Sequence, residues 1–365
     1  MMRPGHTMHL LRGQDSDAVT HSADDLAGTK APKRKRAKVI KHKINLTKKT
    51  DLPWFLRPET YERDSGCDLS EAVRLFKPEE LEITCDNIDK LELGESLGEG
   101  FWREVYKASW KGRDVAVKVV KEDLLDRNDI IPRHVEEAAV IFPIRNEPNI
   151  VGLVGWCNTT VVVDYVPTPL DEFIYDLDNE VTVERALEIA RDAARGLQQL
   201  HAAAGGPFAH TDIQTRQFLI DANGTVLLND FNRVKYTGQR LHSGSVEGHE
   251  KCMFKTAVAK GKWRSPEEYE NRDLDEKLDV YSISLVLWSL RSRVKPFPNY
   301  TKPQVYKKVP KGERPPVDAM KDYPKAMQQL IVRAWNNDPA KRPSSAELAQ
   351  KIDEILTKYK NKKGT

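Results

Sequence analysis

The sequence predicts an α+β protein in which a small antiparallel β-sheet precedes a larger α-helical part. Between residues 91 and 120, apolar and polar residues alternate with a period of two and many are β-branched, which is typical of antiparallel strands. After Thr182, apolar residues recur at spacings of three and four, which is typical of a buried helix face. A β-rich first third followed by an α-rich remainder indicates a sheet lobe and a helical lobe.

The individual elements follow from the same patterns. In the first part we expect strands over Leu91–Gly98, Glu104–Ala108 and Asp114–Val120, a helix over His134–Ile141, and strands over Val151–Val154 and Thr160–Tyr165. In the second part we expect a helix over Ala186–Leu200, a short hairpin of Phe218–Ile220 and Val226–Leu228, and helices over Leu278–Leu290, Lys325–Asn336 and Ser345–Tyr359.

The chain divides into three regions. Residues 1–50 are expected to be a disordered basic tail, because they lack a sustained apolar period. Residues 30–49 hold ten Lys and Arg and no acid, so with a net charge of +3 the rest of the chain sums to −7. Residues 51–87 read as a linker or N-terminal extension, in which Pro53–Leu56 could dock onto a neighbour and Leu69–Leu75 could form a short helix. A single domain over residues 88–360 follows.

Several classes of protein are excluded by composition. No window approaches the roughly 18 consecutive apolar residues of a membrane span, and residues 1–11 lack the apolar core of a secretory signal. Four cysteines lie far apart without a C-x-x-C pair, so we expect reduced thiols, no zinc site, and a cytoplasmic or nuclear protein.

The basic tract Lys33–Arg36 has three interpretations, which the sequence leaves open. It is a nuclear import signal, a contact with nucleic acid or acidic lipid, or a solvated tail. We do not expect nucleic acid as a principal partner.

A turn between the first two expected strands carries two glycines, Gly98 and Gly100. Such glycines let backbone amides approach phosphate groups without a Cβ in the way. Lys118 lies twenty residues after Gly98 at the end of Val-Ala-Val-Lys, and Glu137 follows nineteen residues later on the expected helix, where it could pair with Lys118.

Two aspartates bracket the short expected hairpin. Asp212 lies in the stretch His210–Gln217 before it, and Asp230 opens Asp-Phe-Asn after it. Isolated aspartates in loops are usually turn formers. Here, however, both aspartates flank one hairpin and follow a Lys–Glu pair, an arrangement that favours a functional role over a turn. Carboxylate oxygens are also the ligands that Mg²⁺ prefers.

In this order, the motifs resemble the catalytic domain of the protein kinase superfamily, over about residues 88–360. The resemblance implies a two-lobed protein-kinase-like fold that binds ATP and Mg²⁺ and transfers the ATP γ-phosphoryl group to a Ser/Thr or Tyr hydroxyl of a protein substrate. The pairs that favour the tyrosine-kinase and tyrosine-kinase-like branch are Lys262-Trp263, Pro296-Phe297 and Ala334-Trp335.

The resemblance also implies a role for each candidate residue. Asp212 would orient the acceptor hydroxyl and accept its proton, and Lys118, paired with Glu137, would hold the α- and β-phosphates. Arg216 coincides with an arginine of the tyrosine-kinase catalytic loop and would keep a cation near the γ-phosphate. The expected nucleotide contacts are Gly98, Gly100, Val105, Ala116, Lys118, Asp164, Val166 and Leu219, with Val163 at the rear of the pocket.

Several positions depart from the family pattern. Arg103 stands in place of the third glycine, Thr211 in place of an arginine that pairs with a phosphate on the activation segment, and Gln214 in place of a lysine. Asn232 replaces the glycine after Asp-Phe, which is a mild change because asparagine adopts left-handed conformations readily.

The candidate Mg²⁺ ligands are Asp230 and Gln217. Gln217 replaces an asparagine, so it keeps a carboxamide oxygen but adds one methylene, and Mg²⁺ tolerates misplaced ligands poorly. The alternative to an active kinase is therefore a pseudokinase, a binding or scaffold module that keeps the fold and ATP binding.

The segment from Asp230 to Glu267 bears on regulation. This segment is long and polar, and its candidate phosphorylation sites are Tyr236, Thr237, Ser243 and Ser245. Thr211 provides no cation that could bind a phosphate on any of them. Unless Arg233 or Arg240 supplies this charge, we expect phosphorylation there to change activity only weakly. Control would then come from residues 1–87 or from a regulatory protein partner. Glu267 itself is expected to form a buried ion pair with Arg342.

Overall fold

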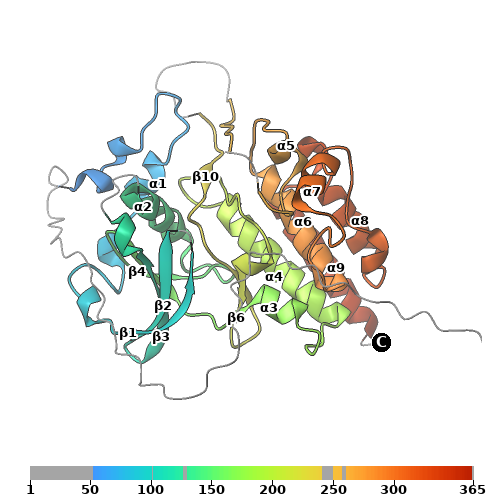
Figure 1. The fold of residues 1–365 in the computed structure, drawn as a ribbon, viewed down its shortest axis with the longest axis horizontal. Helices are drawn as coiled ribbons and strands as arrows, with labels where there is room; N and C mark the ends of the chain where they lie inside the picture. The colour runs from blue at the N-terminus through green and yellow to red at the C-terminus, as the bar shows by residue number, and fades with distance from the viewer. Residues whose placement is uncertain (1–51, 101, 126–129, 241–249, 257–259, 364–365) are drawn as a thin grey trace, which may run out of the picture. The chain divides into compact units, whose positions relative to one another are not determined.

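The computed structural model describes residues 52–100, 102–125, 130–240, 250–256 and 260–363. The expected basic tail, with Lys33–Arg36, and the candidate acceptors Ser243 and Ser245 lie outside the described residues. Within them, an antiparallel sheet with one long helix comes first and a mainly helical part follows (Figure 1). The expected α+β class with a sheet lobe and a helical lobe is confirmed.

The sheet of the first lobe has five strands in the order β1-β2-β3-β5-β4. Its central β2–β3 hairpin pairs continuously from Arg103 opposite Val120 to Trp110 opposite Arg113, so the alternation seen in the sequence is kept along both strands. The strands are β1 (Leu93–Glu99), β2 (Arg103–Trp110), β3 (Arg113–Val120), β4 (Leu153–Cys157) and β5 (Thr160–Asp164). Helix α2 (Ile130–Ile141) packs on β4 and β5.

The strand expected over Val151–Val154 begins later, at Leu153. Val151 instead donates its N–H to the carbonyl of Leu228 at 3.0 Å, and Ile150 bridges to the same residue. The backbone of these two residues therefore joins the sheet lobe to β9 rather than extending β4.

The helical lobe is built around α6 (Lys277–Ser292), which is buried over almost its whole length. The buried stripe of α4 (Val183–His201) faces α6, β9 and α9. The remaining helices are α3 (Leu170–Tyr175), α5 (Pro266–Tyr269), α7 (Lys302–Lys308), α8 (Lys325–Ala334) and α9 (Ser345–Lys363). The short strands are β6 (Thr168–Pro169), β7 (Phe208–Ala209), β8 (Phe218–Ile220), β9 (Val226–Leu228) and β10 (Lys235–Tyr236).

The described part of the N-terminal extension, residues 52–87, packs into the core of the sheet lobe. The rings of Phe55 and Phe76 lie edge-on to Trp156 of β4, with centroids 6.4 and 5.4 Å away. Helix α1 (Ser70–Leu75) packs on α2, so the expected docking and short helix are both present. Ile83 bridges to Gly155, where an added Cβ would lie 2.4 Å from the Cβ of Ile83.

The expectation of reduced cysteines is wrong. Two disulfides, Cys67–Cys252 and Cys85–Cys157, pair all four cysteines of the chain. Their Cα atoms lie 5.5 and 4.9 Å apart, within the range that a disulfide spans. The first bond ties the extension to the segment before α5, and the second ties it to β4. Among the described helices, none has an apolar stretch that would cross a bilayer.

We expect reduction of these disulfides to lower the melting temperature, because each bond closes a long loop in the unfolded chain. Such bonds typically contribute about 2–4 kcal/mol each. Thermal unfolding with and without a phosphine reductant, beside the pairwise variants Cys67→Ser/Cys252→Ser and Cys85→Ala/Cys157→Ala, measures each contribution. An unchanged melting temperature after complete reduction, verified by mass spectrometry, would contradict the expectation.

Candidate active site

A cleft of about 1000 Å³ lies between the sheet lobe and the helical lobe. Its walls come from the β1–β2 hairpin, β3, the segment after β5 and the loops that flank β8 and β9. Glu137 lies behind the wall and is fully buried. The other candidate residues from the sequence line the cleft together: Gly98, Gly100, Val105, Ala116, Lys118, Val163, Asp164, Val166, Asp212, Arg216, Gln217, Leu219 and Asp230.

Lys118 and Glu137 form the expected ion pair. The Lys118 Nζ lies 3.2 Å from the Glu137 Oε1 and 3.3 Å from the Oδ1 of Asn229, the residue before Asp230. Burial alone would raise the pKa of Glu137, but the charges of Arg103 and Lys118 lower it to about 2. Glu137 is therefore ionised, and Lys118 is held at the floor of the cleft.

The part of the cleft near β5 is apolar. Val105 of β2, Ala116 of β3 and Leu219 of β8 contribute side chains from both lobes, a composition that suits a flat aromatic base. The chain then passes from one lobe to the other through Asp164, whose carboxylate pairs with Arg113 at 3.0 Å. Its backbone lies beside this apolar part, where the sequence placed the edge of the adenine.

The loop that carries Asp212 is anchored from below by α6. The fully buried carboxylate of Asp279 accepts the backbone N–H groups of His210 and Thr211 at 2.6 and 2.9 Å. The His210 ring donates its Nε2–H to the carbonyl of Asn229 at 3.0 Å and accepts the Asp212 N–H at Nδ1. These bonds fix the loop before β8 to the loop after β9.

Both oxygens of Asp212 are occupied. Oδ1 lies 2.5 Å from a guanidinium nitrogen of Arg264 and accepts from Gln214 at 3.1 Å, while Oδ2 accepts from Gln217 at 2.9 Å. Arg233 lies 3.5 Å from the same carboxylate. Burial opposes ionisation, yet the net effect of these cations is to hold the pKa of Asp212 below its usual range.

Two residues of these loops adopt left-handed backbone conformations, Thr211 with φ 64° and Asp230 with φ 66°. Strained conformations of this kind concentrate at functional sites, where the surrounding structure must hold them. Asp230 and Gln217 bring one carboxylate and one amide oxygen to the cleft. Hard oxygen donors of this type suit Mg²⁺ that also binds nucleotide phosphates.

A family model described as protein tyrosine and serine/threonine kinase matches residues 91–352. The chain belongs to this family. It is 31% identical over 290 residues to the dual specificity protein kinase shkA of Dictyostelium discoideum, an alignment that covers 76% of this chain and 50% of the relative. It is 28% identical over 284 residues to the mitogen-activated protein kinase kinase kinase 7 of Bos taurus, covering 73% and 44%. The chain thus spans half or less of the length of these relatives.

Some residues that contact the site were not assigned a role from the sequence, among them Arg264 and Arg103. Arg264 directly follows the pair Lys262-Trp263, but nothing in its spacing shows that it reaches Asp212. Arg103 is visible as a departure from the glycine pattern, whereas its contact with Glu137 appears only in the structure. The expected pair of Glu267 and Arg342 is confirmed, with Arg342 donating at 2.7 Å in a buried position.

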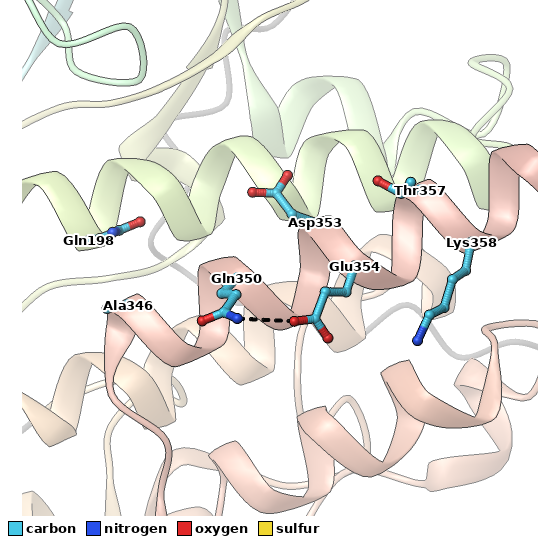
Figure 2. A pocket seen from close by; sticks show the side chains of 7 residues that line it. All are labelled: Gln198, Ala346, Gln350, Asp353, Glu354, Thr357 and Lys358. Carbon is cyan, nitrogen blue, oxygen red and sulfur yellow. Dashed lines mark hydrogen bonds between the residues drawn. The ribbon is translucent and has the colours of Figure 1, made fainter.

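A second hollow of about 670 Å³ lies on the helical lobe, away from this cleft. Figure 2 shows Gln198 of α4 across from side chains of α9, among them Gln350 and Glu354, which bond to each other at 3.1 Å. Its described lining holds polar surface side chains and no pairing like that of Lys118 with Glu137. The candidate residues from the sequence line the cleft between the lobes and not this hollow.

We expect Glu268 to make the stability of the kinase depend on pH. Burial is the main cause that raises the pKa of this fully buried carboxyl from 4.5 to about 7. The native state then binds the proton more tightly than the unfolded chain, so this stabilisation is present below pH 4.5 and is lost as the pH rises to about 7. The loss corresponds to roughly 3 kcal/mol.

Glu268→Gln removes this titration and keeps an oxygen that can accept from Ser265. The variant should unfold at a higher urea concentration than the wild type at pH 8 and should lose the advantage at pH 5. Glu270→Gln, at an exposed carboxylate two residues further along the chain, is the control. A wild type whose stability rises steadily from pH 5 to pH 8, in parallel with Glu268→Gln, would refute the assignment.

Proposed function

We propose that this chain is an ATP-dependent protein kinase that transfers the γ-phosphoryl group of ATP to a protein hydroxyl. The observation that supports it most is the meeting, in one cleft, of the Lys118–Glu137 pair with Asp212 and Asp230. Phosphoryl transfer depends largely on positioning and charge stabilisation, and the charged groups needed for both line the same space.

Each residue has a defined task in this proposal. Lys118 binds the α- and β-phosphates, and the apolar part near Val105 and Leu219 holds the base. Asp230, with the amide oxygen of Gln217, holds Mg²⁺, which when bound neutralises charge on the phosphates. Asp212 accepts the hydrogen bond of the acceptor hydroxyl. As the acceptor oxygen bonds to the γ-phosphorus and the bond to the β-phosphate oxygen breaks, the hydroxyl proton passes to Asp212.

The acceptor is Ser/Thr or Tyr. Relatives at this level of similarity include one named a dual specificity protein kinase and one named a probable serine/threonine-protein kinase, and these names are compatible with either acceptor. Arg216, within 4.0 Å of Asp212, supplies a cation beside the acceptor position. The alternative of a pseudokinase is not favoured, because the family and its named relatives are kinases.

We propose that the N-terminal extension regulates the activity, rather than phosphorylation of the segment from Asp230 to Glu267. Where the family has an arginine, the Thr211 hydroxyl donates to the carbonyl of Arg233 at 2.8 Å, and Arg264 donates to the carbonyl of Thr211. Hydrogen bonds thus hold the segment from Asp230 to Glu267, which is the activation segment, on the catalytic loop that carries Asp212. Cys67–Cys252 links the same segment covalently to the extension packed on α2.

The two disulfides support a proposal about the compartment. Such bonds persist in oxidising environments and are rare in the cytosol and nucleus. A cytoplasmic or nuclear site, as expected from the sequence, would reduce both bonds. We therefore favour an oxidising compartment, and thiol alkylation of protein taken directly from its source distinguishes the two.

The central test is transfer from radiolabelled ATP to a mixed peptide library and to a generic protein acceptor. We expect transfer by the full chain and a loss of at least about 100-fold in Asp212→Asn, since a positioned acid–base group contributes about 10²–10⁴-fold. Asp178→Asn, at an exposed loop aspartate of the helical lobe, is the matched control. No incorporation with any acceptor or divalent metal, or equal incorporation in Asp212→Asn, would lead us to the pseudokinase.

We expect Gln217→Asn to lower the Mg²⁺ concentration needed for half-maximal activity, because the shorter amide suits an octahedral ion better. The Mg²⁺ dependence of transfer, together with stabilisation of the protein by MgADP, measures this. In the structure Gln217 also donates to Asp212 at 2.9 Å. A higher Mg²⁺ requirement in the variant would show that the site depends on this bond to Asp212 instead.

A further inference from the structure

Arg103 is the first residue of β2, at the position of the third glycine of the family. Its side chain is directed inward and is only 8% exposed. One guanidinium nitrogen contacts the Oε2 of Glu137, and Nε donates to Nε2 of His134 at 2.9 Å. Glu137 and His134 lie three residues apart on α2, where side chains share one face of a helix. A single residue of the glycine turn therefore contacts α2 at two points.

The carboxylate of Glu137 consequently has two cationic partners. Its Oε1 binds Lys118 from β3 at 3.2 Å, and its Oε2 binds Arg103 from β2. Both are buried, and removing one partner from a buried charge is strongly unfavourable. Of the two cations, Arg103 is the one with the larger effect in lowering the pKa of Glu137.

We propose that Arg103 is a positioning residue that keeps α2 docked on the sheet, so that the Lys118–Glu137 pair forms before nucleotide binds and without a phosphate on the activation segment. The planar guanidinium fork suits this task because it binds two acceptors in a fixed geometry. This role would compensate for the missing arginine at the position of Thr211, which in the family binds a phosphate on the activation segment. The inference rests on the proposed function for its effect on catalysis, but not for its effect on α2.

A direct phosphate contact is the competing role for Arg103, since the residue also lines the cleft. Its Nε and Nη1 atoms contact His134 and Glu137 instead. The two roles differ kinetically. Loss of a positioning residue lowers kcat at nearly constant KM for ATP, whereas loss of a phosphate ligand raises the KM.

The test compares Arg103→Gln, Arg103→Lys and Arg103→Gly in the full, oxidised chain. Lys111→Gln, an exposed cation on the turn between β2 and β3, is the control. We expect Arg103→Gln to lower kcat about 10- to 100-fold, the range in which misplacement of catalytic groups acts. The KM for ATP should change less than about threefold. Arg103→Lys should recover part of kcat, and Arg103→Gly should not.

Hydrogen–deuterium exchange over residues 131–141 provides a readout independent of transfer. We expect faster exchange of these amides in Arg103→Gln without nucleotide, and near wild-type exchange in Lys111→Gln. Unchanged exchange and kcat in Arg103→Gln, or a raised KM with kcat kept, would overturn the proposal. If the wild type transfers no phosphate, the proposed function fails while the exchange of α2 still decides the role of Arg103.

Discussion

The carboxylate of Glu137 is buried in the sheet lobe, and the geometry of the proposed nucleotide site depends on how the charge of this carboxylate is balanced. A buried carboxylate without a partner is strongly destabilising, so α2 must dock where cations reach both oxygens. Lys118 of β3 and Arg103 of β2 meet this requirement together. The same contacts that stabilise the lobe therefore place Lys118 in the cleft.

In the helical lobe, the corresponding buried carboxylate is that of Asp279 on α6. This buried carboxylate accepts two backbone N–H groups and contacts His201 at 3.1 Å, so the charge is satisfied mostly by the loop it holds. Because His210 also bonds to Asn229, fixing one loop fixes the other. Asn229 in turn binds Lys118, which closes a chain of hydrogen bonds from α6 to α2.

Local patterns were sufficient to predict most of the fold. Period-two alternation predicted β2 and β3, and the spacing of apolar residues predicted α4. Both patterns can be read from the sequence because they involve residues close together along the chain. The disulfide of Cys67 with Cys252 spans 185 residues and has no local signature. For the same reason, the sequence showed that Arg103 departs from glycine without showing its partner. The candidate residues of the cleft were predicted from ordered motifs. For residues 52–87 the sequence predicted that Pro53–Leu56 docks onto a neighbour, but only the structure shows that the partner is Trp156 of β4.

The hydrogen bonds and cations around the Asp212 carboxylate affect whether such a site can transfer phosphate. A carboxylate with a lowered pKa and two occupied oxygens is a weak base. In phosphoryl transfer the protein contributes mainly positioning and charge stabilisation. An ionised Asp212 held by Arg264 and Gln217 is well suited to aligning a hydroxyl and poorly suited to removing its proton early. Arg264 comes from the activation segment, so the alignment of Asp212 depends on that segment, and the segment depends on the extension through Cys67–Cys252.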